Sequence, residues 1–265
     1  MKVDSLHVLV TGGAHGIGAA LCRRFRAEGA RAVTVVDLDG SAATALAAEL
    51  DGLGLEADIS EEQQIQRAVA AAEQAHGPIG LYCSNAGVAY SDHPEWMATS
   101  QSNEQWDRIW RINVMAHVWG ARAVLPGMIE RGAGYFLHTV SAAGLLNQIG
   151  DASYSTTKHA ALGFAESLAI THGDQGIGVS VLCPQAVATR MFQQAEHAAA
   201  ATAASGDGVL KPEDVAEAVI AGLEAESFLI LPHPQVRQYM ERKVSDYDRW
   251  LGGMRRFRRR LFPND

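Results

Sequence analysis

Two side chains able to move a proton, Tyr154 and Lys158, lie four residues apart in the sequence. The segment 154–171 has a helical pattern, in which this spacing places both side chains on one face, one turn apart. A phenol has an ordinary pKa of about 10, so nearby positive charge must stabilise the phenolate before it can act as a base. Ser141 follows the apolar run 135–140, and its hydroxyl can hydrogen-bond an alcohol or carbonyl oxygen. The three residues suggest acid–base chemistry on such an oxygen, although this Tyr–Lys spacing is also found as a packed ring beside a solvated amine.

A glycine-rich turn, Thr-Gly-Gly-Ala-His-Gly-Ile-Gly over 11–18, follows the first apolar run, 6–10, and precedes a helical pattern over 19–28. Glycines let the backbone approach a pyrophosphate, and the N-terminus of the following helix stabilises its charge. An ordinary tight turn between strand and helix rarely needs this many glycines. We therefore expect a nucleotide to bind here, with contacts from Gly12, His15, Gly16, Ile17 and Gly18.

The next apolar run, 32–36, ends at Asp37, about twenty residues beyond the glycine-rich turn. A carboxylate there accepts hydrogen bonds from the ribose hydroxyls of adenosine and repels a 2′-phosphate, which favours NAD over NADP. Asp37 can instead belong to a turn, because residues 37–40 have turn composition. Asp58 and Ile59 follow another short strand, and Asp58 either accepts from the adenine amino group or caps the next helix.

Small or polar residues also follow the predicted strands 79–83 and 178–183. The first is followed by Asn85, Ala86 and Gly87, which suit either a ligand contact or a simple turn. The second is followed by Pro184, Val187 and Thr189. A long helix is predicted over 104–131, uninterrupted up to Pro126, and it contains Asn113 between apolar neighbours. If buried, the Asn113 amide needs hydrogen-bond partners, and it can hold a water or kink the helix.

The alternation of strands and helices predicts a doubly wound parallel sheet, a Rossmann fold of about seven strands with helices on both faces. Ligands bind beyond the carboxyl ends of such strands, where all of these turns lie, so we expect one ligand groove. The catalytic domain is expected over 1–232. Within it, the alanine-rich stretch 190–210 is interpreted as a flap that closes on substrate, or as a loosely packed surface helix. A basic helical extension follows over 233–265.

The composition narrows the class of protein. A formal net charge of −8 argues against a general nucleic-acid binder. Three widely spaced cysteines indicate neither a disulfide framework nor a zinc site, so we expect no metal and a reducing compartment. No apolar run approaches the roughly 20 residues of a membrane span, and the apolar run near the start is too short for a signal peptide. We expect a cytoplasmic protein without stable membrane association.

In order and spacing, four motifs resemble those of the short-chain dehydrogenase/reductase family over roughly residues 5–230. They are T-G-x-x-x-G-x-G from residue 11, N-A-G from 85, Y-x-x-x-K from 154 and P-x-x-V-x-T from 184. The resemblance implies a catalytic tetrad of Asn113, Ser141, Tyr154 and Lys158. In it Tyr154 is the general acid/base, Ser141 orients the substrate oxygen, Lys158 lowers the pKa of Tyr154 and holds the nicotinamide ribose, and Asn113 anchors a relay water.

The resemblance also implies Asp58 at adenine, Asn85 near the ribose, and Val187 and Thr189 at the carboxamide. We therefore expect an NAD-dependent dehydrogenase that interconverts a secondary alcohol and a ketone, both small molecules. The alternatives are an NADPH-dependent carbonyl reductase and a non-catalytic protein that senses nucleotides. The arginine-rich run 255–260 suggests a helix packed across a subunit boundary, in a homodimer or homotetramer, with an anionic membrane as the alternative contact.

The expected substrate pocket is mainly apolar. Its candidate residues, with Trp96 at the rim, are Ala143, Leu145, Gln148, Gln185, Met191 and Phe192. Gln185 replaces a glycine common in the family, so its side chain lines or narrows the pocket. This set contains no Arg or Lys that could bind a carboxylate or phosphate, so we predict a hydrophobic, uncharged substrate.

Overall fold

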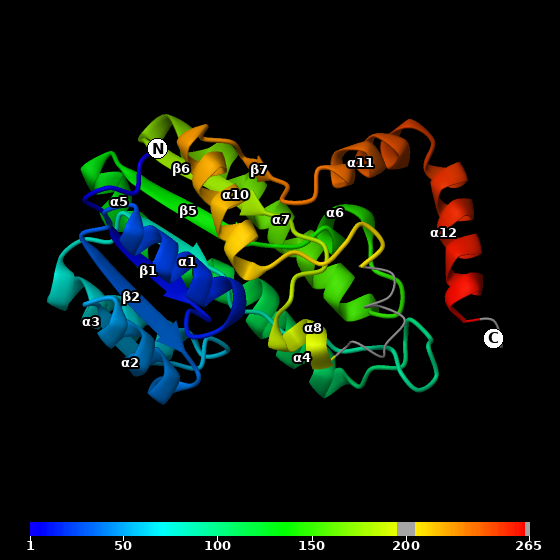
Figure 1. Ribbon diagram of the computed structural model, residues 1–265, viewed down its shortest axis with the longest axis horizontal. Helices are drawn as coiled ribbons and strands as arrows, with labels where there is room; N and C mark the ends of the chain where they lie inside the picture. Colours follow the sequence, from blue (N-terminus) through cyan, green and yellow to red (C-terminus); the bar gives the residue numbers. More distant parts are fainter. Residues whose placement is uncertain (195–204, 263–265) are drawn as a thin grey trace.

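A seven-stranded sheet, parallel throughout, forms the centre of the computed structural model, which describes residues 1–194 and 205–262. The strand order is β3-β2-β1-β4-β5-β6-β7, so the chain starts in the middle and winds outward in both directions. The predicted doubly wound fold is confirmed (Figure 1). The strands are β1 His7–Thr11, β2 Ala32–Asp37, β3 Leu53–Glu56, β4 Leu81–Ser84, β5 Gly134–Thr139, β6 Ile177–Leu182 and β7 Leu229–Ile230.

Helices cover both faces of the sheet, and each face has its own hydrophobic core (Figure 1). Successive side chains of a strand point to opposite faces, so Val8 and Val10 of β1 pack in one core and Leu9 in the other. The Val8 face is covered by α1 Gly16–Ala27, α2 Gly40–Glu49 and α10 Pro212–Glu224. The Leu9 face is covered by α3 Glu62–His76, α5 Ala116–Arg131 and α7 Ala152–His172.

The helix predicted over 104–131 forms, and its irregularity lies around Asn113 and not at Pro126. Helix α4, Asn103–Trp110, passes through a π-helical turn, Arg111–Met115, directly into α5. Pro126 does not interrupt the helix and lies inside α5. A π turn widens the helix locally, and such turns recur at functional sites. Here the turn contains Asn113, which was predicted either to hold a water or to kink the helix.

Two short helices and a C-terminal pair complete the described elements. The short ones are α6 Ala143–Leu146 and α8 Arg190–Gln194, and the pair is α11 Gln235–Ser245 and α12 Tyr247–Leu261. Figure 1 shows α12 standing apart from the sheet and its covering helices, at one end of the molecule. Residues 195–204, the middle of the predicted flap, lie outside the described residues. Among the described helices, none combines the length and apolarity needed to cross a membrane.

Candidate active site

The glycine-rich turn after β1 lies against the loop after β4 at contact distance. Gly12 has a φ of +60°, and a Cβ on it would lie 2.8 Å from the Cα of Ala86. A Cβ on Gly18 would lie 2.0 Å from the carbonyl oxygen of Gly12. The Asn85 side chain holds the turn from the other side, donating from Nδ2 to the carbonyl oxygens of Thr11 (3.0 Å) and Gly12 (3.1 Å). Gly12 must therefore be glycine because of its positive φ, and neither Gly12 nor Gly18 has space for a side chain.

The start of α1 fits the phosphates of a dinucleotide. Within the described residues no side chain caps its first turn, so N–H groups at this helix N-terminus remain available to an anion. Asp37, at the end of β2, accepts hydrogen bonds from the N–H groups of Ala14 (3.0 Å) and Asp39 (3.1 Å). Asp37 thus has the turn role considered for it, and its carboxylate also lines the cavity beside α1.

The other predicted cofactor contacts lie along the same cavity. Asp58 accepts a hydrogen bond from the Ser60 N–H (2.9 Å) just before α3, so it too stabilises a turn. All of the predicted contacts line the cavity wall, and they are Gly12, His15, Gly16, Ile17, Gly18, Asp37, Asp58, Ile59, Asn85, Ala86, Gly87, Tyr154, Lys158, Pro184, Val187 and Thr189. A glycine turn with free helix N–H donors, and a carboxylate acceptor one strand away, suits a dinucleotide.

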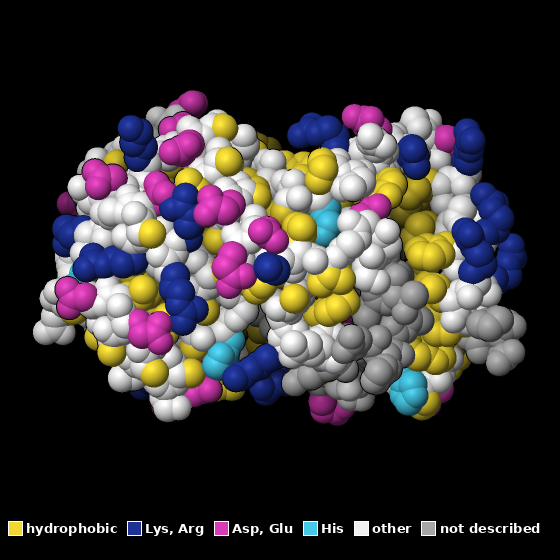
Figure 2. Space-filling model, viewed as in Figure 1, with side chains coloured by type: hydrophobic (Ala, Val, Ile, Leu, Met, Phe, Trp, Pro, Cys, Tyr) yellow, Lys and Arg dark blue, Asp and Glu magenta, His cyan; other side chains and the backbone are white. Residues whose placement is uncertain are grey.

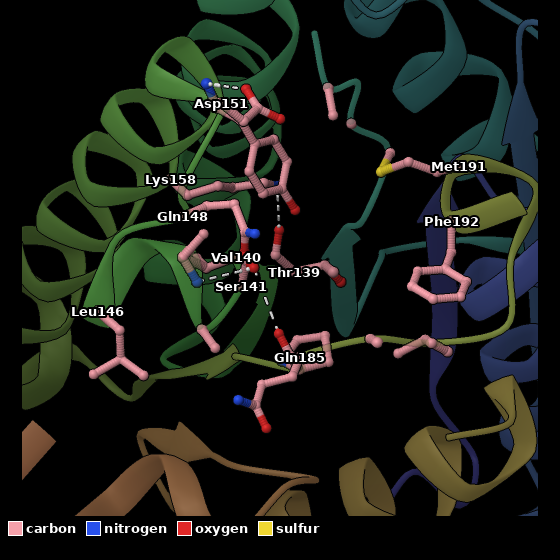
Figure 3. A pocket seen from close by; sticks show the side chains of 18 of the residues that line it. Thr139, Val140, Ser141, Leu146, Gln148, Asp151, Lys158, Gln185, Met191 and Phe192 are labelled. Atoms are coloured by element: carbon pink, nitrogen blue, oxygen red, sulfur yellow. Dashed lines mark hydrogen bonds between the residues drawn. The ribbon is translucent and has the colours of Figure 1, made fainter. Parts of the chain in front are cut away.

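Three of the four predicted catalytic side chains meet beyond the carboxyl end of β5. The Ser141 hydroxyl accepts a hydrogen bond from the Ala143 N–H (3.1 Å) and donates to the Pro184 carbonyl oxygen (3.4 Å) (Figure 3). A side-chain hydrogen bond also joins Ser141 and Tyr154. Lys158 Nζ lies 5.5 Å from the centre of the Tyr154 ring and donates to the carbonyl oxygen of Thr139 (3.0 Å). The helix α7 spacing therefore brings the phenol and the ammonium to one place, as predicted.

The net effect of the surrounding residues is to raise the pKa of Tyr154. Burial raises this pKa to about 12, and the hydrogen bond with Ser141 lowers it by less. Burial also lowers the pKa of Lys158 to about 8. Desolvation disfavours both the phenolate and the ammonium, so the expected lowering of the tyrosine pKa needs a further positive charge at the site.

Asn113, the fourth predicted catalytic residue, is buried and is not among the described residues that line the cavity. Its Oδ1 accepts from the Val88 N–H (2.9 Å), and its Nδ2 donates to the Val88 carbonyl oxygen (2.8 Å) and to Thr157 Oγ1 (3.2 Å). The buried amide is thus fully hydrogen-bonded and connects the loop after β4 with α7. These hydrogen bonds position the loop, and the anchoring of a relay water by Asn113 stays a prediction.

Asp151 is a cavity residue that the sequence reasoning missed. Its Oδ1 accepts a hydrogen bond from the Tyr154 N–H (3.1 Å), which caps the first turn of α7. Burial raises the pKa of Asp151 to about 8; this hydrogen bond lowers it by less, and Asp92 raises it further. The Asp-x-x-Tyr spacing at the start of a helix was the available signal, since it is that of an N-cap.

The cavity has a volume of about 1320 Å³ and extends from the glycine-rich turn past Tyr154 to α12. Sites for a single ligand measure roughly 300–1,000 Å³, so this one has room for a dinucleotide and a second molecule. Five predicted substrate residues line it, namely Ala143, Gln148, Gln185, Met191 and Phe192. The prediction for Leu145 is wrong: its side chain packs in the core, and Leu146 lines the cavity instead (Figure 3).

The C-terminal extension contributes lining residues that were not predicted. They include Tyr239, Arg242, Arg249, Trp250, Met254, Arg256 and Phe257. The premise behind the predicted uncharged substrate, a pocket without Arg or Lys, is therefore wrong. Trp96, expected at the rim, is not among the described lining residues; its ring packs against Phe262, with centres 4.7 Å apart. Among the described residues no three metal-binding side chains gather into a possible metal site.

Comparisons with known proteins agree with this geometry. The family model for "short chain dehydrogenase" matches residues 6–200. A 1-deoxy-11-beta-hydroxypentalenate dehydrogenase of Streptomyces exfoliatus is 34% identical over 253 residues, 93% of this chain and 90% of the relative. A 2-(R)-hydroxypropyl-CoM dehydrogenase of Xanthobacter autotrophicus is 34% identical over 191 residues, 70% of this chain and 76% of the relative.

Among solved structures, a short-chain dehydrogenase/reductase from Burkholderia phymatum in complex with NAD superposes with a TM-score of 0.83. It is 25% identical, and the match covers 94% of this chain and 96% of that one. Family match, relatives and fold agree on an oxidoreductase that acts on hydroxyl or ketone substrates. The chain belongs to the short-chain dehydrogenase/reductase family.

Proposed function

We propose that the protein is an NAD-preferring dehydrogenase that interconverts a hydrophobic secondary alcohol and its ketone, with Tyr154 as general acid/base. One observation carries the proposal: the glycine-rich turn and the Ser141–Tyr154–Lys158 cluster line a single cavity. A phenol, a hydroxyl and an ammonium in one site suit proton transfer at an alcohol oxygen. The named activity of the Streptomyces exfoliatus relative, a dehydrogenase of a hydroxy compound, is of the same kind.

The cofactor's adenosine and phosphates would be held by Asp37 and the N-terminus of α1, and its nicotinamide end by Lys158, Val187 and Thr189. A carboxylate at the position of Asp37 favours a free 2′-hydroxyl over a 2′-phosphate, which is the basis for preferring NAD. The Burkholderia phymatum neighbour is described in complex with NAD. A bound nicotinamide would supply the hydride acceptor and a positive charge.

Ser141 orients the substrate oxygen, and Tyr154 exchanges a proton with that oxygen through its hydroxyl. Positive charge at the site favours the phenolate, and the Lys158 ammonium provides part of it. The pKa of Lys158, about 8, means that this charge is present below that pH and is lost above it. Asn113 keeps the loop after β4 in place through its two hydrogen bonds with Val88.

A panel of secondary alcohols tests the proposal, with NAD and NADP offered separately and the absorbance of the reduced cofactor as the readout. We expect turnover of hydrophobic members with NAD at a higher kcat/KM than with NADP. Faster turnover with NADP would favour the NADPH-dependent reductase. Cofactor binding without turnover of any alcohol, or of any ketone with reduced cofactor, would overturn the proposed activity and favour a nucleotide-sensing protein.

A further inference from the structure

Helix α12 is amphipathic, with its apolar side turned toward the rest of the molecule. Trp250, Met254, Phe257 and Leu261 recur at the spacing of one helix face. Arg249 and Arg256 line the cavity at the edge of this face, and the other arginines of the helix are not among the described lining residues. Figure 2 shows Lys and Arg side chains along the outer edge of α12 and hydrophobic ones along the inner edge, beside a hollow. None of the residues of α12 is buried, so this apolar face is not packed against a core.

The helix is held to the body at its two ends. Near the start of α12, the buried Lys243 of α11 donates from Nζ to the Leu145 carbonyl oxygen (2.7 Å). The same Nζ lies 5.0 Å from the centre of the Trp250 ring in α12. At the far end, the Phe262 ring packs on Trp96, and Arg258 donates to the Trp96 carbonyl oxygen (3.1 Å). The middle of α12 therefore spans an open space between two fixed points.

That space is continuous with the catalytic cavity. Trp250, Met254 and Phe257 line the same cavity as Ser141 and Tyr154. The cavity volume of about 1320 Å³ exceeds what one ligand occupies, so room remains beyond a dinucleotide. A molecule whose oxygen lies at Ser141 and Tyr154 can extend toward α12 without leaving the cavity.

We infer that Trp250, Met254 and Phe257 form the distal wall of the substrate site, and that the substrate has a bulky apolar body reaching from Tyr154 to α12. This inference rests on the proposed function and adds its substrate class. A rigid ring system would cover the exposed aromatic and thioether side chains of this wall, and removing that apolar surface from water favours binding. A small alcohol reaches Tyr154 but leaves the wall in contact with water.

The test compares isopropanol with a methyl carbinol that carries a naphthyl group, using steady-state kinetics with NAD. In the unmodified protein we expect kcat/KM for the naphthyl alcohol to exceed that for isopropanol by about tenfold or more. Trp250→Ala and Phe257→Ala should each lower this ratio by about tenfold, and Trp250→Phe should restore part of it. The matched control is Leu251→Ala, which removes an apolar side chain of α12, 43% exposed, that is not among the described lining residues and should leave both rates unchanged.

The outcomes separate the inference from the proposed function. If neither alcohol is turned over by the unmodified protein, the proposed function fails. If both are turned over but the ratio is the same in Trp250→Ala, Phe257→Ala and Leu251→Ala, the distal wall is overturned. Molar mass from light scattering is measured on every variant. If Trp250→Ala and Phe257→Ala break an oligomer that Leu251→Ala leaves intact, the apolar face is a contact between copies, which also overturns the inference.

Discussion

The two ends of the cavity are built in different ways. At the cofactor end, backbone touches backbone, and a Cβ on Gly18 would come within 2.0 Å of a carbonyl oxygen. At the α12 end, side chains form the wall, and none of the residues of that helix is buried. The cofactor is the same for many enzymes of this kind, whereas the substrate differs between them. Because the cofactor end is formed by backbone and the α12 end by side chains, substitutions in α12 can change the substrate without disturbing the glycine-rich turn.

Gly18→Ala should have the largest effect, because the new methyl group has no space between Gly12 and Asn85. Overpacking of this kind costs about 1–3 kcal/mol or more, and the displaced turn should no longer bind NAD at measurable affinity. Isothermal titration calorimetry with NAD provides the measurement. The control is Gly163→Ala in α7, where a Cβ meets nothing within 4 Å, and which should bind NAD normally. Normal affinity in Gly18→Ala would contradict the close-contact account of the cofactor end.

Asp151→Asn, between the two ends, should change how stability depends on pH. Burial raises the pKa of Asp151 from 3.8 to about 8, so the folded protein retains a proton that the unfolded chain releases over that interval. Stability contributed at low pH is therefore lost as pH rises through this window, by up to about 1.4 kcal/mol per unit. Asn keeps the capping acceptor and does not titrate.

The free energy of unfolding of both proteins, measured in urea at several pH values across this interval, checks the prediction. We expect the advantage of Asp151→Asn over the unmodified protein to grow as pH rises toward 8. An advantage that is constant with pH would show that the Asp151 carboxyl has an ordinary pKa.

Lys243→Met should loosen the substrate end alone. It keeps the apolar stem but removes the hydrogen bond from Nζ to the Leu145 carbonyl oxygen, which is worth about 1.5–3 kcal/mol. We expect trypsin to cleave the arginine-rich part of α12 about tenfold faster, because local opening becomes more frequent. NAD affinity should stay the same. The exposed Lys2→Met serves as the control, and equal cleavage rates in the two variants would contradict the anchoring role of Lys243.

Asp37→Asn should have the smallest effect and concerns the cofactor end. Removing the charge removes the repulsion of a 2′-phosphate, while the amide oxygen still accepts a hydrogen bond from the turn. The ratio of kcat/KM with NADP to that with NAD should rise about tenfold, which corresponds to ~1.4 kcal/mol. An unchanged ratio would mean that Asp37 serves the turn and does not select the cofactor.

Much of the fold was predictable because its signals are local. The apolar runs, the glycine-rich turn and the Tyr154–Lys158 spacing each depend on a few neighbouring residues, and the parallel sheet then follows from their alternation. The positions of the turns beyond the carboxyl ends of the strands predicted a single cavity, and the predicted cofactor contacts line it.

What the sequence missed depends on contacts between distant segments. The position of α12 is fixed by Lys243 at Leu145 and by Phe262 at Trp96, pairs that lie far apart in the chain. Leu145 was predicted to line the cavity where Leu146 does, because α6 is too short for its apolar pattern to define a face. The pKa of Tyr154 depends on burial, which a sequence does not display.

The most direct test of the central claim is Tyr154→Phe, which removes one hydroxyl and leaves no cavity. The measurements are kcat for the best alcohol of the panel and the Kd for NAD. We predict that kcat falls by about a hundredfold to ten-thousandfold, the usual contribution of a general acid/base, while the Kd for NAD stays within about twofold. A variant that keeps most of its kcat would show that another group moves the proton.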